Sequence, residues 1–262
     1  TGFREARMFE FSYEIVALLL CAAFVAGFVD SIAGGGGLIT LPVLMLAGAS
    51  PLEALSTNKV QGAFGAATAA ASYARSGLVD LRTQKGAAAL AFVASFLGAM
   101  LISSIPTEPL RLILPVLLVG IALFFAFKKS LDDTDRQRRI SPKLFVLTLV
   151  PLCGFYDGLV GPGAGAFYML GFVTLAGYGV LKSTAHTKLL NFASNIGGLL
   201  AFAAVGKPLW AIGIAMGFAQ MAGAQIGSKV AMRIGARVIK PLLVATSSIL
   251  AARLIWQMVQ TG

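Results

Sequence analysis

GFVDSIAGGGG at residues 27–37 and GFYDGLVGPGAG at residues 154–165 interrupt two apolar segments of this chain in the same way. Glycine and proline in such number break helices. Each motif also carries an aspartate, Asp30 or Asp157, which is costly in apolar surroundings unless it is paired or protonated. Two breaks at matching positions in two halves of a chain are typical of a binding site built from discontinuous membrane helices.

The composition around these motifs is that of a membrane protein. Of the 262 residues, 57% are hydrophobic and 12% are charged, whereas soluble domains carry about 25% charged residues. Residues 86–105 and 208–227 contain no charged residue, and each is as long as the ~20 residues that cross a bilayer core. The sequence therefore predicts an all-α polytopic membrane protein.

The remaining composition excludes several other classes. The net charge of +10 does not indicate a nucleic-acid partner, because Lys and Arg collect in loops between apolar segments, as the positive-inside bias predicts. Cys21 and Cys153 lie singly, and the chain has one histidine, so we expect neither a disulfide framework nor a metal site. Without a Walker, Rossmann or serine-hydrolase motif, we expect no cofactor and no enzyme activity.

Ten hydrophobic segments follow one another along the chain. Eight are long enough to cross a bilayer, and two short ones directly follow the glycine motifs. At 1.5 Å per residue the short ones cannot cross about 30 Å, so we expect eight full spans and two half-helices or re-entrant segments. The long segments are 11–33, 54–74, 86–105, 109–127, 143–160, 184–205, 208–228 and 238–259, and the short ones are 38–47 and 164–176.

The two halves of the chain can be aligned. A shift of 127 brings Asp30 onto Asp157, and the motif glycines align with it. Further along, a shift of 129 brings Lys59 onto Lys188. A duplication with a two-residue insertion explains this ordered series. We expect an N-terminal segment at 1–10, a first repeat at 11–127, a cytosolic linker at 128–142 and a second repeat at 143–262.

Two topologies are compatible with these segments. If the short segments do not cross, each half has four spans and the repeats are parallel; if they cross, each half has five spans and the repeats are inverted. Segment length favours the first topology, and the distribution of Lys and Arg favours the second. Both place residues 75–85 and 128–142 in the cytosol and leave the side of the termini open.

A polar helix entry follows each glycine motif. Lys188, Asn191 and Asn195 are spaced i, i+3 and i+7, so they share one helical face, and Asn58 belongs to a similar set in the first half. A polar stripe on a membrane helix faces the protein interior or a water-filled cavity. The alternative interpretation is that these amides hold helices together.

Physically, this set suits a small anion. Glycine-rich breaks expose backbone N–H groups, the short helices direct positive ends toward the breaks, and Lys59 and Lys188 add full charges. The predicted substrate-binding residues are Gly34, Gly36, Thr57, Asn58, Lys59, Gly161, Gly163, Thr187, Lys188, Asn191 and Asn195.

The two aspartates and the histidine fit a different task. Burial in apolar surroundings favours the protonated carboxyl, so Asp30 and Asp157 are candidates for proton coupling. Alternatively, each carboxylate accepts hydrogen bonds from its own glycine loop. His186 could titrate near neutrality, or could serve only as a hydrogen-bonding partner.

The motifs as a whole resemble the sulfite exporter TauE/SafE family. The resemblance rests on GFVDSIAGGGGLITLP followed by STNK, and on GFYDGLVGPGAGAF followed by TKLLNFASN, and it spans nearly the whole chain. The second copy has Pro162 where the first has Gly35, and Thr187 where the first has Asn58. The motif positions carried over are Asp30, Gly34, Gly36, Thr57, Asn58, Lys59, Asp157, Gly161, Gly163, Lys188, Asn191 and Asn195.

The resemblance implies a multi-pass permease of a prokaryotic inner membrane that moves sulfur-containing anions of the sulfite, sulfonate or sulfoacetate type. We expect alternating access with an anion held between the repeats, and protons as a possible coupling ion. The other two hypotheses are a passive anion channel and a membrane scaffold or assembly protein. The expected partners are a small anion and the lipid bilayer; the substrate, the direction of transport and the oligomeric state stay open.

Overall fold

The computed structural model describes residues 12–102, 119–120, 122–127, 131–205 and 208–261. Over these ranges the chain is helical and contains no strand, as predicted. The segment predicted at 109–127 lies largely outside the described residues, and so does the start of the linker. The helices are α1 (Tyr13–Ala33), α2 (Gly36–Leu46), α3 (Pro51–Arg75), α4 (Leu81–Met100), α6 (Pro142–Leu159), α7 (Ala164–Gly171) with its continuation η2 (Phe172–Ala176), α8 (Val180–Val205), α9 (Trp210–Ile234) and α10 (Ala236–Thr261).

The helix starts follow from local chemistry. Ser50 and Glu53 form a capping box at the start of α3, with Pro51 at the first helical position. Ser141 caps α6 by accepting a hydrogen bond from the Leu144 N–H.

Glycine conformations produce both predicted breaks. Gly34 and Gly35, between α1 and α2, have φ of +84° and +94°, and Gly161 and Gly163, between α6 and α7, have φ of +92° and +88°. Only glycine adopts this left-handed region without strain. In consequence, α2 and α7 turn back against the long helices that precede them.

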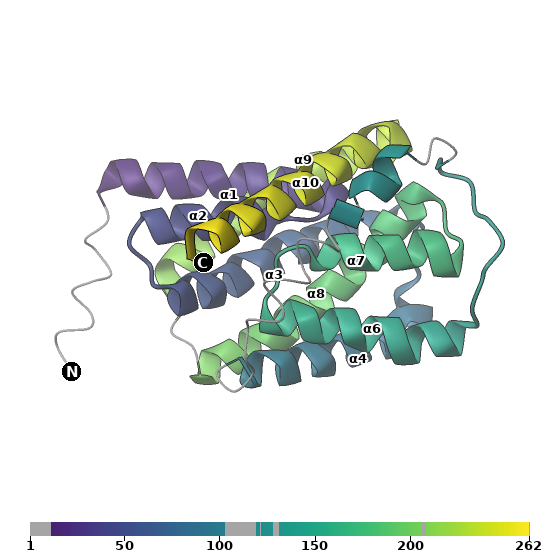
Figure 1. The fold of residues 1–262 in the computed structure, drawn as a ribbon, viewed down its shortest axis with the longest axis horizontal. Helices are drawn as coiled ribbons and strands as arrows, with labels where there is room; N and C mark the ends of the chain where they lie inside the picture. Colours follow the sequence, from purple (N-terminus) through teal and green to yellow (C-terminus); the bar gives the residue numbers. More distant parts are fainter. Residues whose placement is uncertain (1–11, 103–118, 121, 128–130, 206–207, 262) are drawn as a thin grey trace.

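The two helix hairpins run in opposite directions. In Figure 1, α1 runs from left to right and α2 returns to the left, whereas α6 runs from right to left and α7 returns to the right. Each long helix and its short partner thus form a hairpin that begins and ends at the same end of the molecule.

Helix packing mixes the two halves of the chain. The long helices α1, α3 and α9 pack together with the short helix α2, and α4, α6 and α8 pack together with α7. We call these sets the α1–α9 bundle and the α4–α6 bundle. Contacts between α3 and α8 join the two bundles, so α4 and α9 each lie among helices of the other half.

Close backbone contacts hold each bundle together. A Cβ added at Gly223 in α9 would overlap the backbone oxygen of Phe24 in α1, and one added at Gly158 in α6 would overlap that of Ser95 in α4. Small residues at helix interfaces are the usual means of tight packing between membrane helices.

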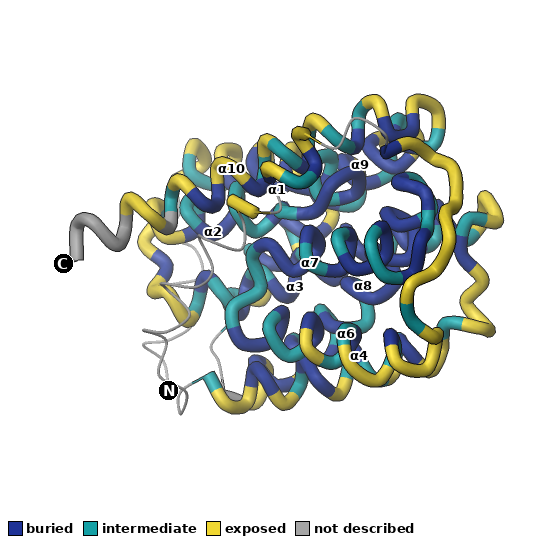
Figure 2. The backbone as a smooth tube through the Cα atoms, turned by 45° about the vertical axis from the view of Figure 1, so that its right-hand side comes forward, coloured by how far each residue is buried: buried dark blue, intermediate teal, exposed yellow. Residues whose placement is uncertain are grey.

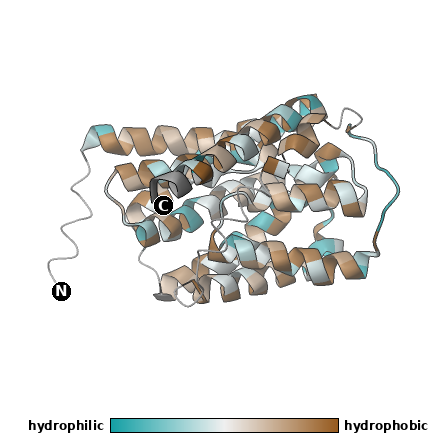
Figure 3. Cartoon of the chain, in the orientation of Figure 1, coloured by the Kyte–Doolittle hydropathy of each residue, from teal (hydrophilic) through white to brown (hydrophobic). Residues whose placement is uncertain are grey.

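Hydropathy separates the outer helices from the central ones. By length and composition alone, α1 and α6 are the two described helices that are apolar enough to cross a membrane. In contrast, α3 carries buried polar side chains such as Thr57 and Lys59, which lower its mean hydropathy. Figure 2 shows α3 and α8 largely buried in the centre, and Figure 3 shows hydrophobic colouring along most of the outer helices.

The described part of the linker is hydrogen-bonded to the starts of the helices. The Asp133 carboxylate accepts hydrogen bonds from the N–H groups of Leu181 and Ala236, at the starts of α8 and α10. Asp135 accepts from Gly179 N–H and from Lys182. Burial raises the pKa of Asp135, but these hydrogen bonds and the Lys182 charge outweigh it and leave the pKa below the ordinary value.

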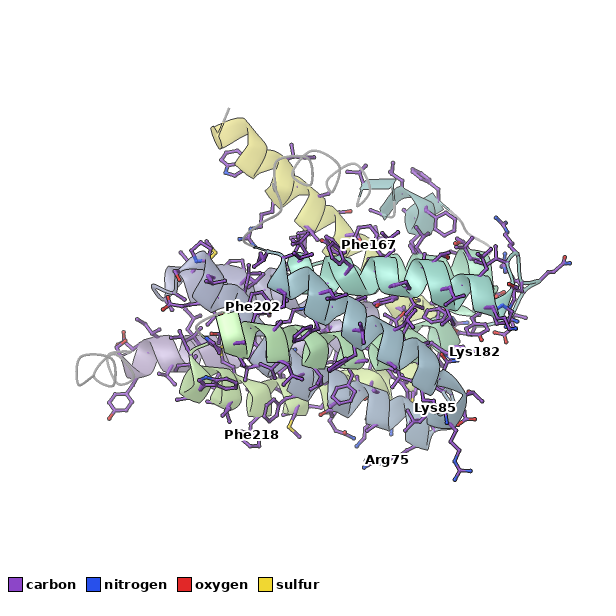
Figure 4. The ribbon with its side chains drawn as sticks, turned by 90° about the horizontal axis from the view of Figure 1, so that it is seen from below. Arg75, Lys85, Phe167, Lys182, Phe202 and Phe218 are labelled. Carbon is purple, nitrogen blue, oxygen red and sulfur yellow. The ribbon has the colours of Figure 1, made fainter. Side chains whose placement is uncertain are left out.

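Basic residues gather at the end of the molecule that holds the linker. Figure 4 shows Arg75, Lys85 and Lys182 together at this end. The described loops at the opposite end, residues 47–50, 101–102 and 208–209, contain no Lys or Arg.

We predict that Gly158→Ala lowers the Tm of the purified protein by several degrees, because the added Cβ overlaps the Ser95 backbone and such overpacking costs about 1–3 kcal/mol. Gly86→Ala is the control: Gly86 is exposed in α4 with open space around it, so alanine should leave the Tm unchanged or raise it. Thermal unfolding in detergent measures both. Equal Tm values for the two variants would contradict the close contact between α4 and α6.

Candidate functional site

The two breaks meet at a small polar cavity. A Cβ at Gly34 would lie 3.2 Å from the Cα of Gly165, so the loop of one half touches the loop of the other. Beside this contact lies a cavity of about 40 Å³, which is room for a few waters or one small ion. Its wall is formed by Asp30, Gly35, Gly36, Gly37, Asn58, Gly62, Asp157, Gly161, Pro162, Gly163, Ala164, Gly165, Asn191, Asn195 and Gln220.

The N-termini of two short helices open onto this cavity. Gly35 precedes α2 and Gly163 precedes α7, and neither provides a side-chain cap. Gly37 and Gly165, at the second position of each helix, line the cavity. N–H groups at this position have no acceptor within the helix, and the helix dipole adds positive potential there. The predicted pair of positive helix ends is therefore present.

Each lysine forms an ion pair with the aspartate of the other half. Lys59 Nζ lies 2.7 Å from Asp157 Oδ1, and Lys188 Nζ lies 3.1 Å from Asp30 Oδ2. Both lysine side chains are almost fully buried. Each pair also connects the α1–α9 bundle to the α4–α6 bundle. From the sequence, the lysines and the aspartates are expected to have separate roles, whereas the structure pairs them.

The surroundings of the two carboxylates differ. Asp157 also accepts a hydrogen bond from Ser194 Oγ, and its side chain is 5% exposed. Asp30 accepts from the Gly36 N–H at 3.1 Å, and its side chain is 21% exposed. The loop-binding alternative thus describes Asp30, which contacts its own glycine loop, but not Asp157.

Three predicted amides line the cavity. Asn58 Oδ1 accepts hydrogen bonds from Thr40 Oγ1 at 2.8 Å and Gln61 Nε2 at 3.1 Å, which leaves its Nδ2 beside Gly37. Asn195 Nδ2 donates to the backbone oxygen of Asn191. The Asn191 side-chain oxygen is buried and has no hydrogen-bond partner among the described residues.

Other predicted residues lie away from the cavity wall. Thr57 Oγ1 accepts a hydrogen bond from the Leu209 N–H, and Thr187 is buried outside the lining. His186 packs against the rings of Phe172 and Tyr178, near the linker. Its Nδ1 lies 2.9 Å from the Lys182 backbone oxygen. The structure therefore does not bring His186 to the aspartates.

Several residues that contribute to the site are not among the residues predicted from the sequence. Gln220 reaches the cavity from α9, and its side-chain oxygen is buried without a partner in the described part of the chain. The sequence could have predicted Gln220 as a site residue, since it is a polar amide within an apolar segment that carries no charge. Ser194 and Thr40 position an aspartate and an amide, and only their contacts show this role.

The family model described as "Sulfite exporter TauE/SafE" matches residues 19–254. The chain belongs to this family. It is 53% identical to the probable membrane transporter protein ORF9 of a Sinorhizobium species, over 95% of each chain. It is 45% identical to the probable membrane transporter protein YfcA of Escherichia coli K12, over 95% of this chain and 93% of that one.

A more distant relative extends the same description. The probable membrane transporter protein YdhB of Bacillus subtilis is 25% identical over 82% of this chain and 88% of its own. No solved structure matches the chain. The TauE/SafE family member described here is thus a membrane transporter, as the motifs predicted.

We predict that Lys59→Met lowers the free energy of unfolding by about 3–5 kcal/mol, because it leaves the Asp157 carboxylate buried without its counter-charge. The double variant Lys59→Met, Asp157→Leu should recover much of this loss, since neither charge then remains. Denaturant unfolding of the wild type, both single variants and the double variant measures the coupling. Strictly additive losses would show that the two side chains do not interact.

Proposed function

We propose that this transporter is a permease for small sulfur-containing anions of the sulfite, sulfonate or sulfoacetate type, and that the anion binds in the central cavity. The observation that carries the proposal is the convergence of the N-termini of α2 and α7 on one cavity beside two buried lysines. Helix N-termini favour anions because their free N–H groups and dipole both attract negative charge.

Charge balance supports an anion over a cation. The two lysines and two aspartates cancel, so they leave no net charge at the centre. What remains is the positive potential of α2 and α7 and the amide groups of Asn58 and Asn191. A small oxyanion accepts hydrogen bonds from all of these groups, whereas a metal cation would face the positive helix ends.

We further propose that the chain consists of two inverted repeats. The opposite directions of the hairpins support this organisation. So do the two ion pairs, each of which joins a lysine of one half to the aspartate of the other. The matching positions of α4 and α9, each packed into the other half's bundle, fit the same two-fold relation. If each hairpin returns to the side on which it begins and the two repeats are inverted, both termini lie on one side of the membrane.

Alternating access would then be a movement between the two bundles rather than between the two repeats. The α3–α8 contact and the two ion pairs are the main links between the bundles. Protonation of an aspartate would release its lysine and loosen one link, which would couple an anion to a proton. Of the three proton-coupling candidates, Asp30 and Asp157 line the cavity and form these links, whereas His186 is not part of the lining.

Flux measurements test the proposal directly. In proteoliposomes the wild type should show saturable flux of labelled sulfite or sulfoacetate, accelerated by an imposed pH gradient. Lys59→Ala, Lys188→Ala should abolish this flux, because the buried aspartates would then repel the anion. Flux that neither saturates nor responds to the gradient would favour the passive channel, and unchanged flux in the double variant would exclude the lysines from transport.

The basic end predicts the orientation. Because Lys and Arg mark the cytosolic side, we expect residues 75–85 and 128–142 in the cytosol and both termini outside it. A C-terminal alkaline phosphatase fusion should be active in cells, and a C-terminal green fluorescent protein fusion should be dark. The reverse result would contradict the orientation.

A further inference from the structure

We propose that the two lysines have different roles. Lys188 binds the transported anion, and Asp30 forms an ion pair with Lys188 when no anion is bound. Lys59 and Asp157 form a structural link between the bundles. This inference rests on the proposed function and deepens it, because it assigns the anion to one of two half-sites that are related in sequence.

Protein groups occupy two of the three N–H donors of Lys59 and both carboxylate oxygens of Asp157. Lys59 Nζ donates to Asp157 Oδ1 at 2.7 Å and to the Asp157 backbone oxygen at 2.6 Å. The other oxygen of the same carboxylate accepts from Ser194 Oγ. Two hydrogen bonds to the carboxylate and one to the Asp157 backbone oxygen stabilise this buried pair in its present arrangement.

The Lys188 ammonium group has fewer hydrogen-bond partners. An ammonium group has three donors, and within the described residues Lys188 Nζ has one partner, Asp30 Oδ2 at 3.1 Å. Lys188 is nevertheless only 1% exposed. Buried donors without acceptors are costly, so two N–H groups of Lys188 call for an additional acceptor.

The missing acceptor would lie in the cavity. Lys188 Nζ lies 3.9 Å from the Cβ position of Gly165, which lines the cavity at the start of α7. Asn191, one turn after Lys188, lines the same wall, and its buried side-chain amide has an unpartnered oxygen. An oxyanion there would meet the ammonium group and a helix N-terminus, and a protonated oxyanion such as hydrogen sulfite would also donate to the Asn191 oxygen.

Asp30 can leave Lys188 more readily than Asp157 can leave Lys59. Its side chain is 21% exposed, and the Gly36 N–H provides a second partner that it can keep. The anion would therefore replace one carboxylate oxygen at Lys188, and no covalent bond would change. Asp30 acts in this description as an internal substitute for the substrate.

The sequence itself carries the difference between half-sites. Three residues after Lys188 stands Asn191, but three residues after Lys59 stands Gly62, which has no side chain to bind a ligand. Six residues after Lys188 stands Ser194, which holds Asp157, while Gly65 at the equivalent place after Lys59 cannot hold Asp30. Both sequence differences agree with one half-site that binds the anion and one that is structural.

Two isosteric variants, Asp30→Asn and Asp157→Asn, test this division in the full-length protein purified in detergent. Each leaves one lysine without its counter-charge, so each should lower the Tm. Sodium sulfite should restore the Tm of Asp30→Asn, because the anion replaces the lost carboxylate, and its Kd should fall about tenfold below that of the wild type, which corresponds to ~1.4 kcal/mol. Asp157→Asn should show only the wild-type response. Sodium gluconate at equal ionic strength controls for salt.

A further variant links the effect to Lys188. In Asp30→Asn, Lys188→Met, sulfite should no longer raise the Tm. Equal rescue of both asparagine variants, rescue of Asp157→Asn alone, or rescue of neither would overturn the proposal. So would an Asp30→Asn protein that cannot be isolated even in sulfite when Asp157→Asn can.

The rescue experiment and the flux measurement together separate this inference from the proposed function. If the wild type moves no sulfur anion in proteoliposomes but sulfite still rescues Asp30→Asn, the transport proposal fails and the assignment of Lys188 stands. If the wild type transports sulfite and the rescue is absent, the reverse holds.

Discussion

Two buried lysine–aspartate pairs, each formed between opposite halves of the chain, are the constraint on which the rest of this structure depends. A lysine or an aspartate alone would be very costly at this depth, so each requires its partner. The aspartates stand just before the helix breaks, and the lysines lie on α3 and α8. Pairing them therefore brings the two breaks, the two short helices and the two central helices to one place.

The glycines serve this arrangement in two ways. At the breaks, left-handed conformations turn α2 and α7 back, so that helix ends rather than helix sides face the cavity. Elsewhere, as at Gly158 and Gly223, the absence of a side chain lets helices of different halves approach to backbone contact. The resulting bundles are composite, and the ion pairs lie between them. In the proposed mechanism, opening of the cavity loosens at least one of these pairs.

Much of this could be expected from the sequence. Composition and segment length indicate a helical membrane protein, and the paired motifs locate the breaks, because glycine conformations and helix periodicity are local properties. The same motifs led to the family, which the comparisons confirm. Spacing along one helix face also placed Asn191 and Asn195 at the cavity. For Thr57, Thr187 and His186, motif proximity suggested the cavity, but packing directs these side chains elsewhere.

The sequence alone thus determines where the helices break and which polar residues are available at depth. It does not reveal which lysine meets which aspartate, since Lys59 and Asp157 are 98 residues apart and Lys188 and Asp30 are 158 residues apart. Nor does it reveal that α9 contributes Gln220, or that the hairpins run in opposite directions. These features arise from long-range packing, in which a buried charge selects its partner by position in space and not by distance along the chain.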